Sequence, residues 1–174
     1  MATFVSSKDI LNLTWIGDRR LLAGCRNGRM YAVDPLEKKA DMRCIQVKGT
    51  GDITSVAKIS EVDGSQIVAV CIGNNVELWG IPRGKVSFSS RLRTPLELYS
   101  DLQTTWNYMG KLPRHPLATF QDQSQRTFVS AFALDPSTLL VSYAERAVVI
   151  WELNLQTNPV EADVVDGMRA TGHV

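Results

Sequence analysis

The chain has 174 residues, of which 44% are hydrophobic and 21% are charged, with a formal net charge of +1. This length suffices for one domain with a hydrophobic core, and the composition is that of a globular chain rather than a disordered one. The small net charge and the scattered basic residues disfavour nucleic acid and acidic membrane surfaces as partners.

Targeting and membrane signals are weak in this sequence. It holds no run of about 18 apolar residues, so it predicts no membrane span. The N-terminus lacks the basic start and apolar core of a signal peptide. Three cysteines, Cys25, Cys44 and Cys71, are widely spaced. Their number and spacing favour reduced thiols in an intracellular protein, cytoplasmic or nuclear, over a disulfide or a metal site.

The first predicted unit spans residues 9–48. A strand from Ile10 to Ile16 precedes a β-hairpin over residues 21–34, and a further strand follows from Met42 to Lys48. The hairpin turn is Asn27-Gly28, a pair that favours a tight turn because both residues accept a positive φ.

The second predicted unit spans residues 53–90. Its first strand runs from Ile53 to Ile59, and its hairpin covers residues 67–80 with a turn at Gly73-Asn74-Asn75. Apolar runs on both sides of this turn are typical of a β-hairpin.

An insertion of residues 91–116 follows, and its pattern is helical. Thr94-Pro95-Leu96-Glu97 resembles a capped helix start, because Thr is a good N-cap and Pro suits the first helical position. Apolar residues then recur at spacings of three and four, which places them on one helical face: Leu96, Tyr99, Leu102, Trp106 and Met109. The sequence therefore predicts an amphipathic helix over residues 95–109.

The third predicted unit spans residues 117–170. A strand from Phe128 to Leu134 precedes a hairpin over residues 139–152, whose turn at Glu145-Arg146 has poor turn chemistry. The three hairpins begin at residues 21, 67 and 139 and align without a gap over fourteen residues, at offsets of 46 and 72. Units of short strands repeating at this period are typical of β-propeller blades.

The repeated hairpins resemble those of the WD40 family of β-propellers. The residues that carry the resemblance are Gly24, Asn27, Gly28, Asp34, Trp79, Trp151 with Glu152, and the terminal pair Gly172 and His173. They match the family's Gly-containing hairpins, its Trp-Asp strand ends and the Gly-His pair that opens a repeat. No single unit carries the whole set. The resemblance implies an all-β fold: a partial propeller of about three four-stranded antiparallel blades with one inserted helix. It also implies structural roles for these residues.

Three units are fewer than a closed propeller needs, since closure typically takes roughly four to eight blades. The open edges favour three interpretations: a piece of a larger propeller, half of a two-chain assembly, or self-association through those edges. The resemblance implies binding to other proteins.

The sequence predicts no catalytic, cofactor-binding or metal site. It lacks a phosphate-binding loop, a Gly-x-Ser-x-Gly elbow, a His-Glu-x-x-His helix and any Cys-x-x-Cys pair. With His115 and His173 as its two histidines, it offers little for histidine-based chemistry. We therefore expect no enzyme activity.

The insertion holds the candidate partner-binding residues. They are aromatic or basic and are Arg91, Arg93, Tyr99, Trp106, Tyr108, Lys111 and Arg114. The alternative is that the apolar stripe packs on the propeller itself. The sequence thus predicts a protein-interaction scaffold or adaptor. One alternative is a substrate receptor of a cullin-based ubiquitin ligase, although Trp79-Gly80 and Trp151-Glu152 depart from the docking motif of that subclass. Another is a truncated fragment with no function of its own.

Overall fold

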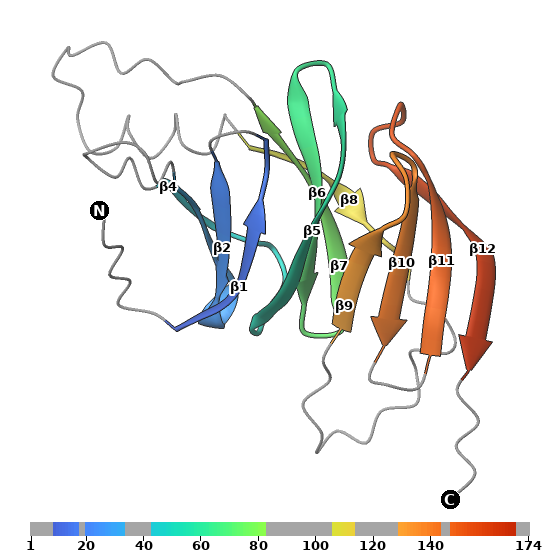
Figure 1. Ribbon diagram of the computed structural model, residues 1–174, viewed down its shortest axis with the longest axis horizontal. Coiled ribbons are helices and arrows are strands. Elements are labelled where there is room, and N and C mark those ends of the chain that lie inside the picture. The colour runs from blue at the N-terminus through green and yellow to red at the C-terminus, as the bar shows by residue number, and fades with distance from the viewer. Residues whose placement is uncertain are drawn as a thin grey trace, which may run out of the picture.

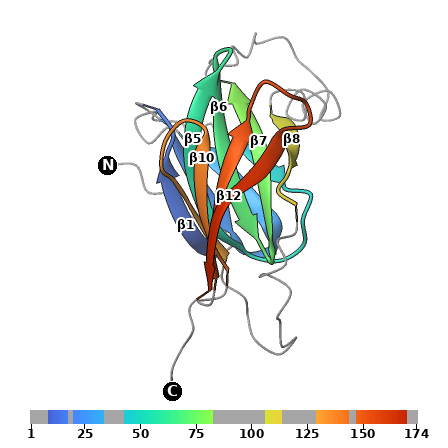
Figure 2. The same cartoon turned by 90° about the vertical axis from the view of Figure 1, so that its right-hand side faces the viewer.

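The computed structural model describes residues 9–17, 20–33, 43–82, 106–113, 129–143 and 147–169. Within these ranges, twelve strands form three four-stranded antiparallel sheets, and each sheet is a meander of consecutive strands. The sheets stand side by side along the molecule (Figure 1), and the view from one end shows them stacked face to face (Figure 2). The prediction of an all-β fold with three four-stranded units is confirmed.

The first sheet contains β1 (Ile10–Trp15), β2 (Leu21–Cys25), β3 (Arg29–Val33) and β4 (Arg43–Gln46). A single 3-10 turn, Arg26–Gly28, joins β2 to β3, with φ at 62° for Asn27 and 69° for Gly28. Both residues thus adopt the left-handed conformation for which Asn and Gly are suited.

The second sheet contains β5 (Ile53–Val62), β6 (Ser65–Ile72), β7 (Asn75–Pro82) and β8 (Asn107–Lys111). β8 pairs antiparallel with β7, from Gly80 opposite Asn107 to Glu77 opposite Lys111. The helix predicted over residues 95–109 is therefore wrong at 107–109, where pairing with β7 provides the backbone hydrogen bonds. Its other positions, except Trp106, lie outside the described residues.

The third sheet contains β9 (Val129–Ala133), β10 (Thr138–Tyr143), β11 (Ala147–Asn154) and β12 (Glu161–Arg169). The turn predicted at residues 145–146 lies outside the described residues. A bulge in the β11–β12 pairing falls between Ile150 and Trp151.

The gapless alignment of the three hairpins is wrong for β6. Three residues separate β2 from β3, whereas Ile72 pairs with Asn75 and leaves a two-residue turn. Leu22 consequently corresponds to Ala69 and not to Val68. Leu22 packs between the first and second sheets, and Ala69 between the second and third, so each faces the following sheet. A slip of one residue reverses the face of every side chain in a strand.

Two hydrophobic clusters lie between neighbouring sheets and form the core. The cluster between the first and second sheets includes Leu22, Met30, Val70 and Trp79. The larger cluster, between the second and third sheets, includes Cys71, Leu78, Leu139, Val149 and Trp151. Cys25 and Cys71 are buried thiols, as the sequence predicts.

Candidate interaction surfaces

The first strands of neighbouring sheets are joined by side-chain hydrogen bonds to the backbone. Asn12 Oδ1 accepts from the N–H of Val56 at 3.1 Å, and the Thr14 hydroxyl donates to the Val56 carbonyl at 2.6 Å. These bonds tie β1 to β5 and fix the distance between the first and second sheets.

A related pair of hydrogen bonds joins β5 to β9. Ser55 Oγ accepts from the N–H of Ala131 at 3.4 Å, and the Thr54 hydroxyl donates to the Val129 carbonyl at 2.6 Å. Ser55 pairs with Cys71 in β6, as Asn12 pairs with Gly24 in β2, and these partners correspond in the corrected alignment. Asn12 in the first sheet and Ser55 in the second therefore occupy equivalent positions, and each accepts a hydrogen bond from the first strand of the next sheet.

A buried carboxylate reinforces the packing between the first two sheets. Glu77 is 2% exposed, and its Oε2 accepts from Trp79 Nε1 at 3.0 Å and from the N–H of Lys48 at 3.2 Å. The Lys48 ammonium lies 3.7 Å from the ring centre of Tyr108, a cation–π contact. Burial, and then the charge of Glu77, raise the pKa of Tyr108.

The candidate partner-binding residues have different environments. Trp106 is 6% exposed and packs in the cluster between the first and second sheets, so its ring is a core element. Tyr108 is partly buried, with its ring edge-on to Trp79 at 5.3 Å. Lys111, at the end of β8, is exposed. Arg91, Arg93, Tyr99 and Arg114 lie outside the described residues.

The described repeat positions have structural environments. A Cβ on Gly24 would lie 2.5 Å from Ile53 Cγ2, so only glycine lets the first sheet approach the second this closely. Trp79 and Trp151 are buried, and each ring faces the preceding sheet. Asp34, Gly172 and His173 lie outside the described residues.

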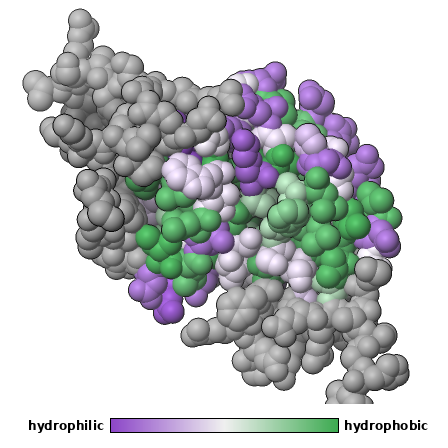
Figure 3. All heavy atoms as spheres, in the orientation of Figure 1, coloured by the Kyte–Doolittle hydropathy of each residue, from purple (hydrophilic) through white to green (hydrophobic). Residues whose placement is uncertain are grey.

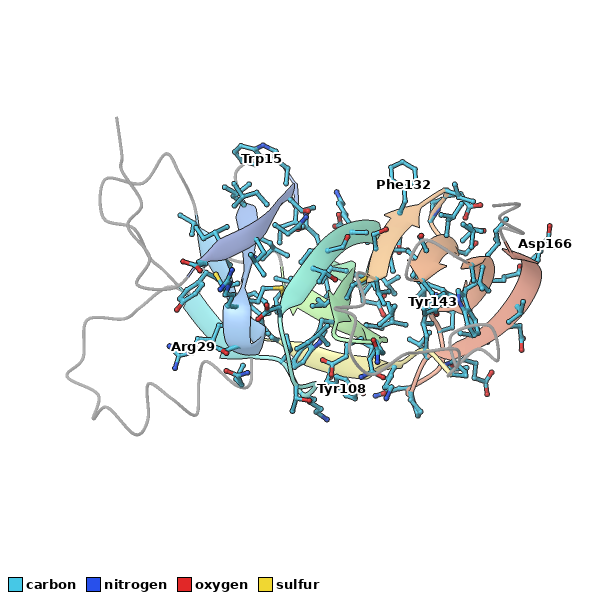
Figure 4. All side chains as sticks on the ribbon, turned by 90° about the horizontal axis from the view of Figure 1, so that it is seen from below. Trp15, Arg29, Tyr108, Phe132, Tyr143 and Asp166 are labelled. Atoms are coloured by element: carbon cyan, nitrogen blue, oxygen red, sulfur yellow. The ribbon has the colours of Figure 1, made fainter. Side chains whose placement is uncertain are left out.

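Exposed apolar side chains gather on the first strands of the two end sheets. Leu13 and Trp15 in β1 are each 56% exposed, Phe132 in β9 is 66% exposed, and Leu134 directly follows β9. Trp15 and Phe132 project from the same side of the molecule (Figure 4), and the space-filling view has separate hydrophobic areas on that side (Figure 3). The exposure of these residues was not predicted from the sequence, because alternation in a strand does not reveal which of its faces is covered.

The described residues contain no group of three or more His, Cys, Asp or Glu that is suited to hold a metal ion. Among the same residues, no helix has the length and apolar character needed to cross a membrane.

Comparison with solved structures identifies the architecture. The chain superposes on Hsv2 of Kluyvelomyces marxianus with a TM-score of 0.51 at 10% identity, covering 88% of this chain and 46% of that one. The chain has the fold of a β-propeller. A second match, at a TM-score of 0.41 and 11% identity, is the β-propeller domain of Cps50 (Swd1) of Myceliophteria thermophila, with 92% of this chain and 59% of that chain covered. Comparisons with family models and with curated proteins return no match.

The three sheets are thus three blades of an open β-propeller, and β1, β5 and β9 are their inner strands. The chain spans less than half the length of Hsv2. The second blade is covered on both faces by neighbouring blades. No other described blade packs on the face of the third blade that is turned away from the second, and its residues are exposed or half-buried. We call it the third-blade face: Ser130, Phe132, Leu140, Ser142, Val148 and Ile150.

Proposed function

We propose that this chain is a non-catalytic scaffold or adaptor that binds other proteins inside the cell. The observation that carries the proposal is the exposure of Trp15 and Phe132 beside a well-packed core. Large exposed apolar groups on a soluble fold mark interaction sites, and aromatic residues are enriched in them. Rigid blades hold such groups at fixed positions without the ordering cost of a mobile surface.

The edge of the second blade is a further candidate contact. β8 is the outermost strand of that blade, and it ends at the exposed Lys111. Tyr108 lies in the same strand, with the ammonium of Lys48 over its ring. Arg91, Arg93, Tyr99 and Arg114, which flank this strand in the sequence, would add positive charge and aromatic surface. This combination suits an acidic protein segment.

The test is quantitative affinity capture with the tagged chain, followed by binding measurements on each recovered protein. Lys111→Glu reverses the charge at the edge of β8, and Lys58→Glu makes the same change at an exposed position of β5. We expect at least one purified partner to bind the wild-type chain and Lys58→Glu equally, and Lys111→Glu at least tenfold more weakly. Equal binding by both variants would exclude the β8 edge, and the absence of any partner that binds directly would refute the scaffold proposal.

A further inference from the structure

The third-blade face repeats a position that makes a contact between blades elsewhere in this chain. Ser130 pairs with Ser142, just as Asn12 pairs with Gly24 and Ser55 with Cys71. In the first two blades, the residue at this position accepts a hydrogen bond from the next inner strand. In the third blade that residue, Ser130, is exposed on the surface.

The first blade has a residue at the position that corresponds to the hydrogen-bond donors. The donors at the two internal contacts are the N–H groups of Val56 and Ala131, which pair with Val70 and Val141 in their own blades. Leu13, paired with Ala23, occupies the corresponding position in β1. Leu13 and its neighbour Trp15 are both more than half exposed.

The exposed apolar part of this first-blade surface is limited to β1. Residues of β2 and β3 on the same side of the sheet are buried in a cluster of their own: Ala23, Cys25, Tyr31 and Val33. The inner strand is nevertheless the element through which the internal contacts are hydrogen-bonded, β1 to β5 and β5 to β9. The internal contacts also pack β2 and β3 against β6 and β7, and β6 and β7 against β10 and β11, whereas a further contact at this surface involves β1.

We propose that β1 of one copy of this chain docks on β9 of a second copy, through the same inner-strand hydrogen bond that joins β5 to β1 and β9 to β5 within one copy. Ser130 Oγ then accepts a hydrogen bond from the N–H of Leu13 of the partner subunit, and Phe132 packs against its Trp15. The reciprocal contact forms on the other side, so that the two copies enclose one ring. This association rests on the proposed function and deepens it, because it names a second copy as the protein that Trp15 and Phe132 bind, and it leaves the β8 edge to another partner.

Blade number and charge favour a second copy as the occupant. The described blades of two copies together number six, which falls within the roughly four to eight of closed propellers. Two-fold symmetry is also the commonest way in which identical chains close an assembly. Beside the ion pair of Asp9 with Arg26, the first blade exposes Arg29, and the third blade exposes the opposite charge of Asp166, which pairs with Ile150.

Light scattering after size exclusion, over a range of concentrations, tests the proposal on the 174-residue chain. We expect twice the mass of one chain. Phe132→Asp and Trp15→Asp should each give single chains with unchanged circular dichroism, because each buries a charge in both contacts of the ring. Lys58→Asp, at an exposed position of the middle blade, is the control and should remain a dimer.

The two variants also distinguish modes of association. A wild-type chain that has the mass of one copy at every concentration would overturn the proposal, and would leave the third-blade face to blades from another source. Dissociation by Trp15→Asp alone would indicate that β1 pairs with β1, which also overturns it. An equimolar mixture of Phe132→Asp and Trp15→Asp keeps one intact contact, so it should recover part of the dimer that neither variant forms alone.

Discussion

The second and third blades have the same strand order but different surroundings. In the second blade, seven of the eight residues of β6 are buried, because sheets cover it on both sides. In the third blade, buried residues of β10 alternate with half-buried ones, because only one face is covered. The same meander therefore forms with a two-sided or a one-sided core. The continuous apolar run of Ile67–Ile72 is typical of a strand covered on both faces, whereas β10 has the polar residues Thr138 and Ser142 on its half-buried face.

The largest expected effect separates the two faces of the third blade. Trp151→Ala removes a side chain that is 2% exposed between the second and third blades. Loss of its packing and the cavity that remains should cost about 3–5 kcal/mol of the free energy of unfolding. Phe132→Ala, on the opposite face of the same blade, should change the stability of the single chain by less than about 0.5 kcal/mol.

Urea unfolding at low protein concentration measures both effects without a contribution from association. Equal losses of stability in the two variants would mean that the third-blade face is covered within the single chain. The third blade would then be covered on both faces, as the second blade is, and the proposed difference between them would be wrong.

The next effect tests the close contact between the first blade and the second, at Gly24. In Gly24→Ala the new Cβ meets the methyl group of the fully buried Ile53 at 2.5 Å, so the strands must shift. Overpacking of this kind costs about 1–3 kcal/mol. Gly80→Ala is the matched control, because its Cβ would meet Met109 Sδ at an ordinary 3.4 Å. Thermal unfolding should give a lower midpoint for Gly24→Ala, and an unchanged or raised one for Gly80→Ala.

The repeat in the sequence was sufficient to predict the fold. Three hairpins with similar residues at their turns and strand ends indicated three blades, and the strands expected near residues 10–16, 53–59 and 128–134 were found. The predicted two-residue turn at Asn27-Gly28 is a three-residue turn with Arg26, but both residues have the expected positive φ. Turn residues and apolar runs are local signals, so they survive large divergence elsewhere.

Two features depended on contacts that the sequence does not display. The spacing of Trp106 and Met109 fits a helix, yet β7 offers an unpaired edge, and Met109 lies in the strand that pairs with it. The turn before Asn75 is one residue shorter than the turn before Arg29. The side chain of Val68 therefore points to the first sheet and not to the third. Both the strand at Met109 and the orientation of Val68 depend on which strands pair and in which register, and a single sequence does not give the pairing directly. The exposed Phe132 was missed for the same reason, since its exposure depends on which blade lies beside it.

The pH dependence of stability in the alkaline range tests the buried interface between the second and third blades. Burial raises the pKa of Cys71 from 9.0 to about 12. Burial likewise raises the pKa of Tyr143, from 10.0 to about 12. Each group keeps its proton in the folded chain at pH values where the unfolded chain has lost it. Stability should therefore fall as pH rises from the unfolded pKa towards the folded one, by about 1.4 kcal/mol per pH unit for Cys71.

Urea unfolding at about pH 8 and about pH 10.5 measures this dependence. Cys71→Ala and Tyr143→Phe should each be less sensitive to alkali than the wild-type chain, whatever their stability at the lower pH. An unchanged pH dependence in Cys71→Ala would mean that water reaches this thiol in the folded chain, and that the packing between the two blades is looser than described.

The smallest effect compares one position in three blades. Asn12→Ala and Ser55→Ala each leave a backbone N–H of the next inner strand without its acceptor, which should cost about 1–2 kcal/mol in a single chain. Ser130→Ala removes the corresponding side chain where the single chain supplies no next blade, so its unfolding free energy at low concentration should not change. In the dimer the same substitution should weaken association severalfold, because it removes one hydrogen bond from each of two contacts. Sedimentation equilibrium of Ser130→Ala beside the wild type separates these outcomes. Ser130→Ala could instead lose as much single-chain stability as Ser55→Ala. Ser130 would then have a hydrogen-bond partner within its own chain, and the proposed contact with a second copy would be contradicted.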